Sequence, residues 1–147
     1  MPHPQWKIEE LQSEIESIRQ RVLQVSTGLN QYFVEKQEVI ELMIISMIAQ
    51  EPLLIVGTPG TAKSDLIIKF CEAIGVSGTE YFEYMLTKFS EPSEILGPVD
   101  INEMRQGAYV RRIEGKLPTA KIAFLDEIFK SNSAILNTLL TVINERK

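Results

Sequence analysis

The stretch Glu51-Pro-Leu-Leu-Ile-Val-Gly-Thr-Pro-Gly-Thr-Ala-Lys-Ser64 decides the expected fold. Its apolar part, residues 53–56, predicts a buried strand that ends at Gly57, and a helical pattern begins at Lys63. This layout is that of a phosphate-binding P-loop, in which backbone N–H groups and the positive end of the helix face a phosphate. The residues expected to bind a nucleotide are Gly57, Thr58, Pro59, Gly60, Thr61, Ala62, Lys63, Ser64 and Asp65.

Individual residues of the loop have distinct expected roles. Lys63 would reach the β- and γ-phosphates and act as a catalytic residue, and the Ser64 hydroxyl would ligate Mg²⁺. Ala62 stands where the usual motif has glycine, so the backbone there is predicted not to take a positive φ. The alternative interpretation is an ordinary Gly/Pro turn between a strand and a helix.

A second apolar run ends in two acids. Residues 122–125 show no alternation, which predicts a strand buried on both faces in a parallel sheet. Asp126 and Glu127 follow at its carboxyl end, where open α/β sheets bind ligands. Asp126 is the candidate Mg²⁺ ligand, and Glu127 is the candidate group that orients and deprotonates the attacking water. The alternative is a charged helix start.

Composition narrows the function classes. The 147 residues suit one domain or a piece of one, and a net charge of −5 makes nucleic-acid binding unlikely. The single cysteine, Cys71, cannot form an internal disulfide and is expected to pack in the core. The sequence has no apolar run of membrane-spanning length and no signal-peptide core, so we expect a soluble cytoplasmic protein.

An amphipathic helix is expected over residues 1–28, ending at Ser26-Thr27-Gly28. Packing of its apolar stripe against the rest of the domain is favoured over a short coiled coil, because the stripe spans under three heptads. The stripe consists of Ile8, Leu11, Ile15, Ile18, Val22 and Val25. Residues 29–147 would then form the main domain.

Further elements are predicted along the chain. A helix is expected over residues 35–50, a strand over 81–87, a short helix from Pro92 and a hairpin arm over 107–115. The inward positions of the first of these are expected to be Val39, Leu42, Met43, Met47 and Ile48. A last helix, capped by Ser131, would present Ile135, Leu136, Leu139, Leu140 and Ile143 on one face.

Together these motifs resemble the AAA+ ATPases, and among them the MoxR family, especially its RavA-like members. The P-loop carries the alanine that this family commonly uses. The segments 82–90, 92–98, 115–118 and 124–146 resemble the family's second strand, following helix and Walker B region. The likeness covers nearly everything from Leu29 onward.

The resemblance implies roles for further residues. The segment before the first strand would flank the adenine, and Thr87 would hold the Walker B glutamate in check. Residues 108–113 look like a hairpin inserted into helix 2, which usually faces the pore of a ring and touches substrate. The residues concerned are Tyr32, Phe33 and Val34 for the adenine, and Arg111 and Arg112 for the hairpin. Two solvated arginines are the plain alternative, and Arg146 would be an intersubunit contact or an ordinary helix-end cation.

The resemblance also implies an incomplete fold. AAA+ domains are three-layer α/β/α P-loop NTPases with a parallel sheet of strand order 5-1-4-3-2. The sequence holds counterparts of strands 1, 2 and 3, whereas strands 4 and 5, the sensors, the arginine finger and the helical lid lie beyond Lys147. The absence of strand 4 would leave a gap in the sheet between strands 1 and 3. Strands 1 and 3 could close that gap, a partner chain could fill it, or the chain could fold only in part.

Three functions follow as hypotheses. The first is an ATPase motor, binding ATP and Mg²⁺, that remodels protein clients as a homo-oligomeric ring, expected to be a hexamer, with a von Willebrand factor A-type partner. The second is a nucleotide-binding interaction module with little or no hydrolysis of its own. The third is a DNA-remodelling ATPase, which the acidic balance opposes. ATP hydrolysis that depends on Lys63 and Glu127 separates the first two.

Overall fold

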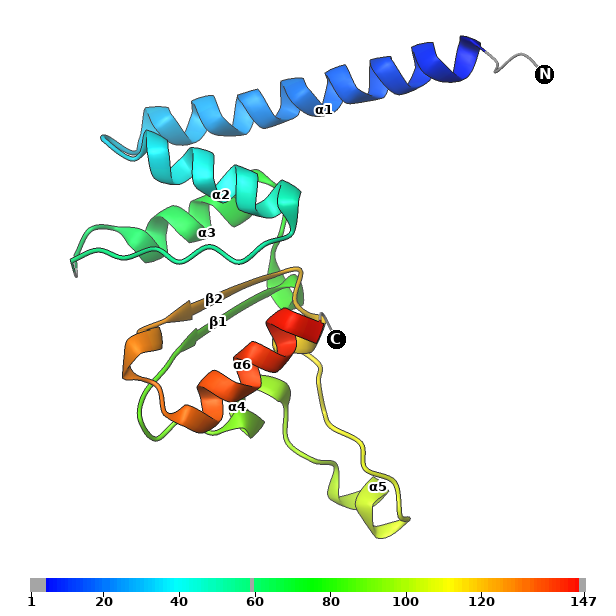
Figure 1. Ribbon diagram of the computed structural model, residues 1–147, viewed down its shortest axis with the longest axis vertical. Coiled ribbons are helices and arrows are strands. Elements are labelled where there is room, and N and C mark those ends of the chain that lie inside the picture. The colour runs from blue at the N-terminus through cyan, green and yellow to red at the C-terminus, as the bar shows by residue number, and fades with distance from the viewer. Residues whose placement is uncertain (1–4, 59, 146–147) are drawn as a thin grey trace. The chain divides into compact units, whose positions relative to one another are not determined.

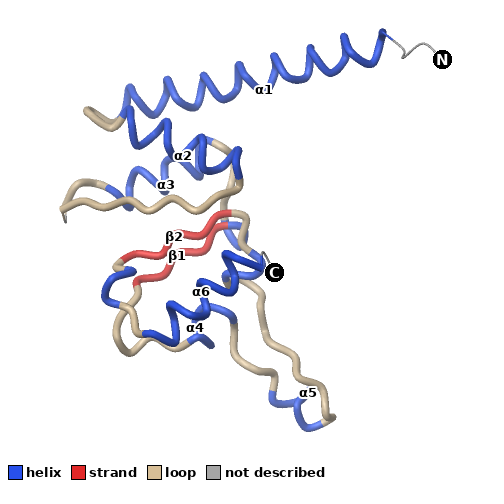
Figure 2. Tube along the Cα trace, in the orientation of Figure 1, coloured by secondary structure: helices blue, strands red, loops and turns tan. Residues whose placement is uncertain are grey.

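The computed structural model describes residues 5–58 and 60–145. The chain divides after Ile74 into two compact units, residues 1–74 and 75–147. Figure 1 labels the elements of each unit and Figure 2 distinguishes helices, strands and loops. The first unit is helical, whereas the second contains the sheet. The architecture is α/β, which is compatible with part of an AAA+ fold.

The first unit is built from α1 (Gln5–Tyr32), α2 (Gln37–Ala49) and α3 (Lys63–Ala73). The carboxyl-terminal part of α1 packs against α2 and α3, while its other end extends away from them (Figure 1). Apolar side chains from all three helices form the core of this unit. The buried residues are Leu29, Phe33, Ile40, Met43, Ile44, Leu66, Ile67, Phe70 and Cys71. The predicted core position of Cys71 is confirmed.

The first helix is longer than expected. The predicted end at Ser26-Thr27-Gly28 is wrong, because α1 continues through Gly28 to Tyr32. A glycine inside a helix costs only about 1 kcal/mol. Continuing the helix buries Leu29, and Phe33 directly after it, which offsets that cost. The apolar stripe behaves differently, since its residues between 8 and 18 are exposed, so the predicted packing against the domain is wrong for this part.

The inward face of α2 also differs from the prediction. Met43 is buried as expected, but Ile40 and Ile44 accompany it, while Leu42 and Ile48 lie exposed. The helix is apolar almost all the way round, so its sequence has no period that selects one face.

The segment that precedes the P-loop is not a strand. Residues 51–58 form a loop, and among the described residues they pair with no strand (Figure 2). The predicted strand over residues 53–56 is therefore wrong for this structure. Leu54 and Val56 are 60 % and 74 % exposed, so the side chains that predicted burial remain largely in solvent. A strand in a sheet needs hydrogen-bond partners on its edges, and the described residues of this unit form no strand that could supply them.

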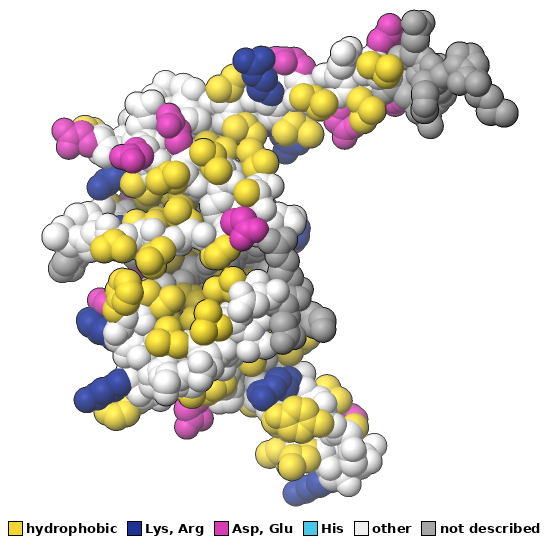
Figure 3. All heavy atoms as spheres, viewed as in Figure 1, with side chains coloured by type: hydrophobic (Ala, Val, Ile, Leu, Met, Phe, Trp, Pro, Cys, Tyr) yellow, Lys and Arg dark blue, Asp and Glu magenta, His cyan; other side chains and the backbone are white. Residues whose placement is uncertain are grey.

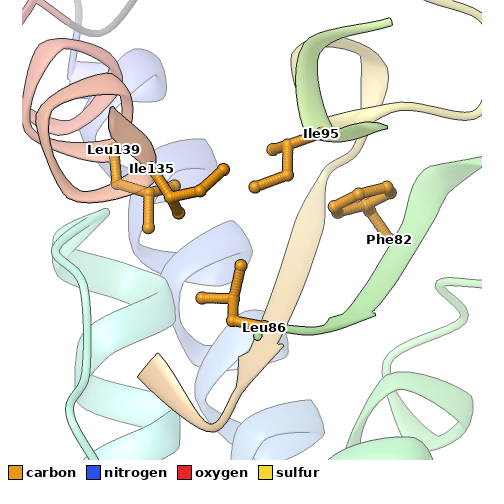
Figure 4. Packing of buried hydrophobic residues seen from close by; sticks show 5 residues of the cluster. All are labelled: Phe82, Leu86, Ile95, Ile135 and Leu139. Carbon is orange, nitrogen blue, oxygen red and sulfur yellow. The ribbon is translucent and has the colours of Figure 1, made fainter. Parts of the chain in front are cut away.

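The second unit is organised around β1 (Tyr81–Met85) and β2 (Ile122–Asp126), which pair in parallel. The register sets Tyr81 beside Ile122 and Met85 beside Asp126. Helices α4 (Pro92–Leu96) and α6 (Ser133–Glu145) supply the remaining core side chains. Figure 4 shows the core residues pointing toward one another, and they are Phe82, Leu86, Ile95, Ile135 and Leu139.

Short 3₁₀ helices complete this unit, at Gly78–Glu80, Leu117–Thr119 and Ile128–Lys130. The strand expected over residues 81–87 is confirmed but ends at Met85. The short helix predicted from Pro92 is also confirmed, with a capping box between Glu91 and Glu94.

Burial of β2 is weaker than predicted. Four of its residues are half-buried and Ala123 is exposed, so the expectation of two covered faces is wrong here. A two-stranded sheet has too little surface to be enclosed by layers on both sides.

An insert with its own short helix separates α4 from β2. Its two arms come together through an antiparallel bridge between Val99 and Arg111, and α5 (Ile101–Arg105) forms its tip. The Asp100 N–H donates to Val110 O at 2.8 Å, and the Arg112 N–H donates to Pro98 O at 2.9 Å. The hairpin arm expected over residues 107–115 therefore pairs through one bridge and is not a regular strand.

The cap of α6 differs from the prediction by one residue. The Asn132 side chain accepts a hydrogen bond from the Ile135 N–H at 3.0 Å, so Asn132 takes the capping role assigned to Ser131. The Ser131 hydroxyl instead donates to Ile128 O at 2.6 Å. Within the described residues, no helix is both long and apolar enough to cross a membrane.

Gly97 provides a test of the base of the insert. Its φ is +92°, and a Cβ added there would lie 2.1 Å from the carbonyl oxygen of Arg112. We expect Gly97→Ala to lower the free energy of unfolding by roughly 1–3 kcal/mol, measured by urea denaturation, because the backbone of one arm must move. Gly115→Ala is the control, since Gly115 also has a positive φ but lies in open space. Equal losses from both substitutions would contradict the close approach.

Candidate nucleotide-binding site

The P-loop in the first unit is closed by its own lysine. The Lys63 ammonium donates to Gly57 O at 3.0 Å and to Thr58 O at 2.9 Å. The Thr61 hydroxyl also donates to Thr58 O at 3.0 Å. Lys63 begins α3, so its side chain folds back over the loop from the first turn of the helix. The ammonium group is thereby held at the loop that precedes α3.

The loop turns through two residues with positive φ. Gly60 has φ +79°, and Ala62, the residue before the helix, has φ +56° and ψ +27°. The prediction that Ala62 avoids a positive φ is wrong. A left-handed alanine costs roughly 1–2 kcal/mol, and α3 begins at the next residue, Lys63.

The composition of the loop suits a phosphate group. A cavity of about 180 Å³ lies beside it, and Lys36 and Lys63 both line this cavity. A Cβ at Gly57 would lie 3.9 Å from the Lys63 Nζ, so a side chain there would occupy space next to the ammonium group. Two cations and a helix amino terminus are groups of the kind that bind phosphate in proteins.

Lys36 was not among the residues expected from the sequence. It precedes α2 and lines the cavity together with Val39. Its position directly after the expected adenine-flanking segment is the signal that could have identified it. Within that segment, Phe33 is buried, whereas Tyr32 and Val34 are exposed. The rings of Tyr32 and Phe33 meet edge to face, with their centroids 4.8 Å apart.

The acid pair lies in the second unit, at the carboxyl edge of its sheet. Asp126 is the last residue of β2, and its carbonyl accepts the Leu86 N–H at 2.9 Å. Its carboxylate accepts the Glu127 N–H at 2.8 Å. Thr87 follows β1 at the same edge, because parallel strands end side by side. The structure therefore brings Thr87, Asp126 and Glu127 to one edge of the sheet.

Glu127 has an unusual backbone and an ionic partner. Its φ is +57°, a strained value for a residue with a side chain, and its carboxylate lies 3.0 Å from the Lys130 ammonium. The Thr87 hydroxyl lies 3.3 Å from the Ser90 hydroxyl and accepts the Phe89 N–H at 3.2 Å. The partners of the Thr87 hydroxyl therefore lie in the turn that directly follows β1.

The turn after β1 is tied to α6 by a residue that the sequence did not single out for the site. The Asn132 amide donates to Ser90 O at 2.8 Å and to Lys88 O at 3.1 Å. Its location just before an amphipathic helix indicated a cap, but its partners more than 40 positions away could not be read from the sequence.

The two arginines of the insert make contacts within it. Arg111 donates to Gly97 O at 2.8 Å and to the Tyr109 hydroxyl at 3.0 Å. Arg112 forms an ion pair with Asp100 at 2.8 Å. Both guanidinium groups therefore join the arms of the insert. Pro59 and Arg146, which were also predicted as site residues, lie outside the described residues.

A metal ligand set is the remaining question. Among the described residues, no group of three or more His, Cys, Asp or Glu side chains is placed to hold a metal ion. Ser64 and Asp126 belong to different units, and each is a single oxygen donor of the kind that Mg²⁺ prefers.

Comparisons with known proteins extend the sequence resemblance. Residues 20–147 match the family described as the MoxR domain in the MoxR-vWA-beta-propeller ternary systems. Two uncharacterized proteins of Methanocaldococcus jannaschii, MJ0079 and MJ0812, are similar to the chain. MJ0079 is 43 % identical over 138 residues, which cover 93 % of this chain and 34 % of the relative. MJ0812 is 46 % identical over 119 residues, or 80 % of this chain and 31 % of the relative.

A viral protein is also similar. The structural protein ORF618 of Acidianus two-tailed virus is 30 % identical over 139 residues, which cover 93 % of this chain and 22 % of the viral protein. The chain thus spans about a third or less of the length of these relatives.

The P-loop before α3 and the parallel strand ending in two acids are features of the AAA+ class of ATPases. The family match covers most of the chain, and the chain belongs to the MoxR family of that class. Members of this class generally bind ATP with Mg²⁺, and the donor groups of the P-loop suit that ligand.

The Asp100–Arg112 pair yields a prediction about pH. The hydrogen bond from Arg112 holds the pKa of Asp100 below its usual range, with further support from the Asn102 N–H. Because the pKa of Asp100 is lower in the folded chain than in the unfolded chain, its ionised carboxylate stabilises the insert at pH values above the unfolded pKa. This stabilisation is lost as the pH falls through the folded pKa. We expect an NMR titration of the Asp100 carboxyl to show a lower pKa in the wild-type chain than in Arg112→Gln. Indistinguishable titration curves would contradict the ion pair.

Proposed function

We propose that the chain is the nucleotide-binding part of a MoxR-type motor that hydrolyses ATP and remodels protein clients, in the manner of the RavA-like members. The observation that carries this proposal is the Lys63 ammonium, which α3 holds at the P-loop carbonyls beside the first turn of the helix. Family membership supports the assignment to an ATPase class.

The proposal gives each predicted site residue a role toward ATP and Mg²⁺. Lys63, with the loop residues around it, binds the β- and γ-phosphates, and the Ser64 hydroxyl and the Asp126 carboxylate are the protein groups that suit Mg²⁺. Tyr32, Phe33 and Val34 flank the base. ATP with Mg²⁺ supplies a phosphoryl group that can be transferred to water.

Glu127 would serve as the group that orients this water and accepts its proton. Its ion pair with Lys130 is exposed, and such pairs contribute only about 0–1 kcal/mol, so the carboxylate is available to turn toward another partner. Thr87, which follows β1 at the same sheet edge, would receive Glu127 in a resting state. The strained backbone of Glu127 supports this functional role, because such strain concentrates at active sites.

The proposed partners follow from the family. Its description names systems that combine MoxR with von Willebrand factor A and β-propeller components, which supports a von Willebrand factor A-type partner here. A homo-oligomeric, hexameric ring, a protein client and a cytoplasmic location complete the proposal. The net charge of −5 argues against nucleic acid as the client.

A second candidate is a nucleotide-binding interaction module with little hydrolysis of its own. The observation that favours it is that residues 53–56 form no strand of the described sheet, since an ATPase sheet normally includes the strand that leads into the P-loop. In this case the chain would bind ATP, and binding would alter the P-loop without efficient turnover.

The two candidates share a binding test. We expect Lys63→Ala to weaken ATP binding about 10- to 100-fold by isothermal titration calorimetry, because charge-assisted hydrogen bonds contribute roughly 1.5–3 kcal/mol. Lys69→Ala is the matched control, since Lys69 lies on the same helix and pairs with Glu72. Unchanged affinity in Lys63→Ala, or an equal loss in Lys69→Ala, would contradict the P-loop assignment.

Hydrolysis then separates the candidates. The motor predicts phosphate release that Glu127→Gln lowers by at least about 100-fold, while ATP still binds. The interaction module predicts ATP binding that Lys63→Ala weakens, with no phosphate release above the Glu127→Gln background.

A further inference from the structure

The apolar stripe at the free end of α1 is a contiguous exposed surface. Ile8, Leu11, Ile15 and Ile18 are each 52–64 % exposed, whereas Leu29 on the same helix is 5 % exposed. Apolar side chains follow one another along this end of α1 in Figure 3. Single exposed aliphatic residues are common, but a continuous stripe of four indicates an interaction surface. The family match begins at residue 20, so the exposed part of the stripe, Ile8 to Ile18, lies outside it.

The spacing of the stripe is that of a coiled coil. Its residues alternate at steps of three and four, which places Ile8, Ile15 and Val22 at the a positions of a heptad and Leu11 and Ile18 at the d positions. A repeat of 3.5 residues keeps a seam facing a partner helix along its whole length. β-branched residues at a, with leucine at the first d, favour a parallel two-stranded pair. Ile18 departs from the leucine preferred at d, so the orientation rests mainly on charge.

The charges beside the stripe complement a second copy in parallel. Glu14 occupies a g position and Arg19 the following e position, and in parallel coils these positions of the two helices face each other. An antiparallel pair confined to the same exposed stretch, with Ile8 against Ile18, would set Glu14 against Glu14. Arg19 also pairs with Glu16 of its own helix at 3.5 Å, but this contact is exposed and weak.

We propose that α1 pairs in parallel and in register with α1 of a second copy of this chain, through the seam of Ile8, Leu11, Ile15 and Ile18. An antiparallel register that overlaps further would need Val22 and Val25, which are half-buried within their own unit. The parallel register uses only the residues that are exposed on both copies. With fewer than three heptads, the pairing is weak and concentration-dependent.

Disulfide trapping in the full chain tests the register directly. Leu11→Cys places a thiol at a d position, where two parallel helices bring equivalent residues close enough for a disulfide. The native Cys71 is buried, so the unsubstituted chain gives the background. Leu23→Cys is the matched control, because Leu23 is an exposed leucine on the same helix outside the seam. We expect about ten times more covalent dimer from Leu11→Cys in a glutathione redox buffer. Equal trapping, or none, would overturn the proposal.

Substitutions in the seam and in its flanking charges separate self-pairing from other occupants. Ile15→Glu should abolish the concentration-dependent rise in mass in sedimentation equilibrium. It should leave the helicity unchanged, because the Ile15 side chain is exposed. Leu23→Glu should leave both the rise in mass and the helicity unchanged. In the Leu11→Cys background, Glu14→Arg should reduce trapping several-fold, and adding Arg19→Glu should restore it. A stripe covered by another protein or by the chain's own second unit predicts a monomer at every concentration and no rescue by the double charge reversal.

Discussion

The hydrogen-bonding demand of the main chain governs both units of the structure. Outside the regular helices and strands, side chains donate hydrogen bonds to backbone C=O groups in both units, whether those groups are exposed or partly buried. In the P-loop, the Lys63 ammonium donates hydrogen bonds to the carbonyl oxygens of Gly57 and Thr58. In the second unit, the Asn132 side-chain amide donates hydrogen bonds to the carbonyl oxygens of Lys88 and Ser90. The side chains that complete the backbone are therefore also those that organise the candidate site.

The same demand explains which strands form. β1 and β2 satisfy each other through parallel pairing, and this pairing brings Thr87, Asp126 and Glu127 to one edge. Residues 53–56 are as apolar as a strand but have no neighbouring strand in their unit, and they remain a loop. Of the three resolutions expected for the gap in the sheet, direct pairing of the first and third predicted strands does not occur among the described residues.

Sequence patterns predicted the features that depend on local chemistry. The start of α3 at Lys63, the strand ending at Asp126 and the short helix from Pro92 all follow from turn residues and short apolar runs. Features that depend on distant packing were missed. The continuation of α1 through Gly28 depends on the burial of Leu29, and the inward face of α2 depends on which neighbours cover an almost wholly apolar helix. Ala62 shows a similar limit, because only the geometry of the turn requires its positive φ.

The central proposal is that Ser64 and Asp126 bind the same metal-bound nucleotide. Paramagnetic broadening tests it directly, with substoichiometric Mn²⁺ in place of Mg²⁺ and a non-hydrolysable ATP analogue. The account predicts that the amide NMR signals of Ser64 and Asp126 broaden together at the same Mn²⁺ concentration, while that of Tyr109 in the insert persists. Broadening of Ser64 without Asp126 would contradict it.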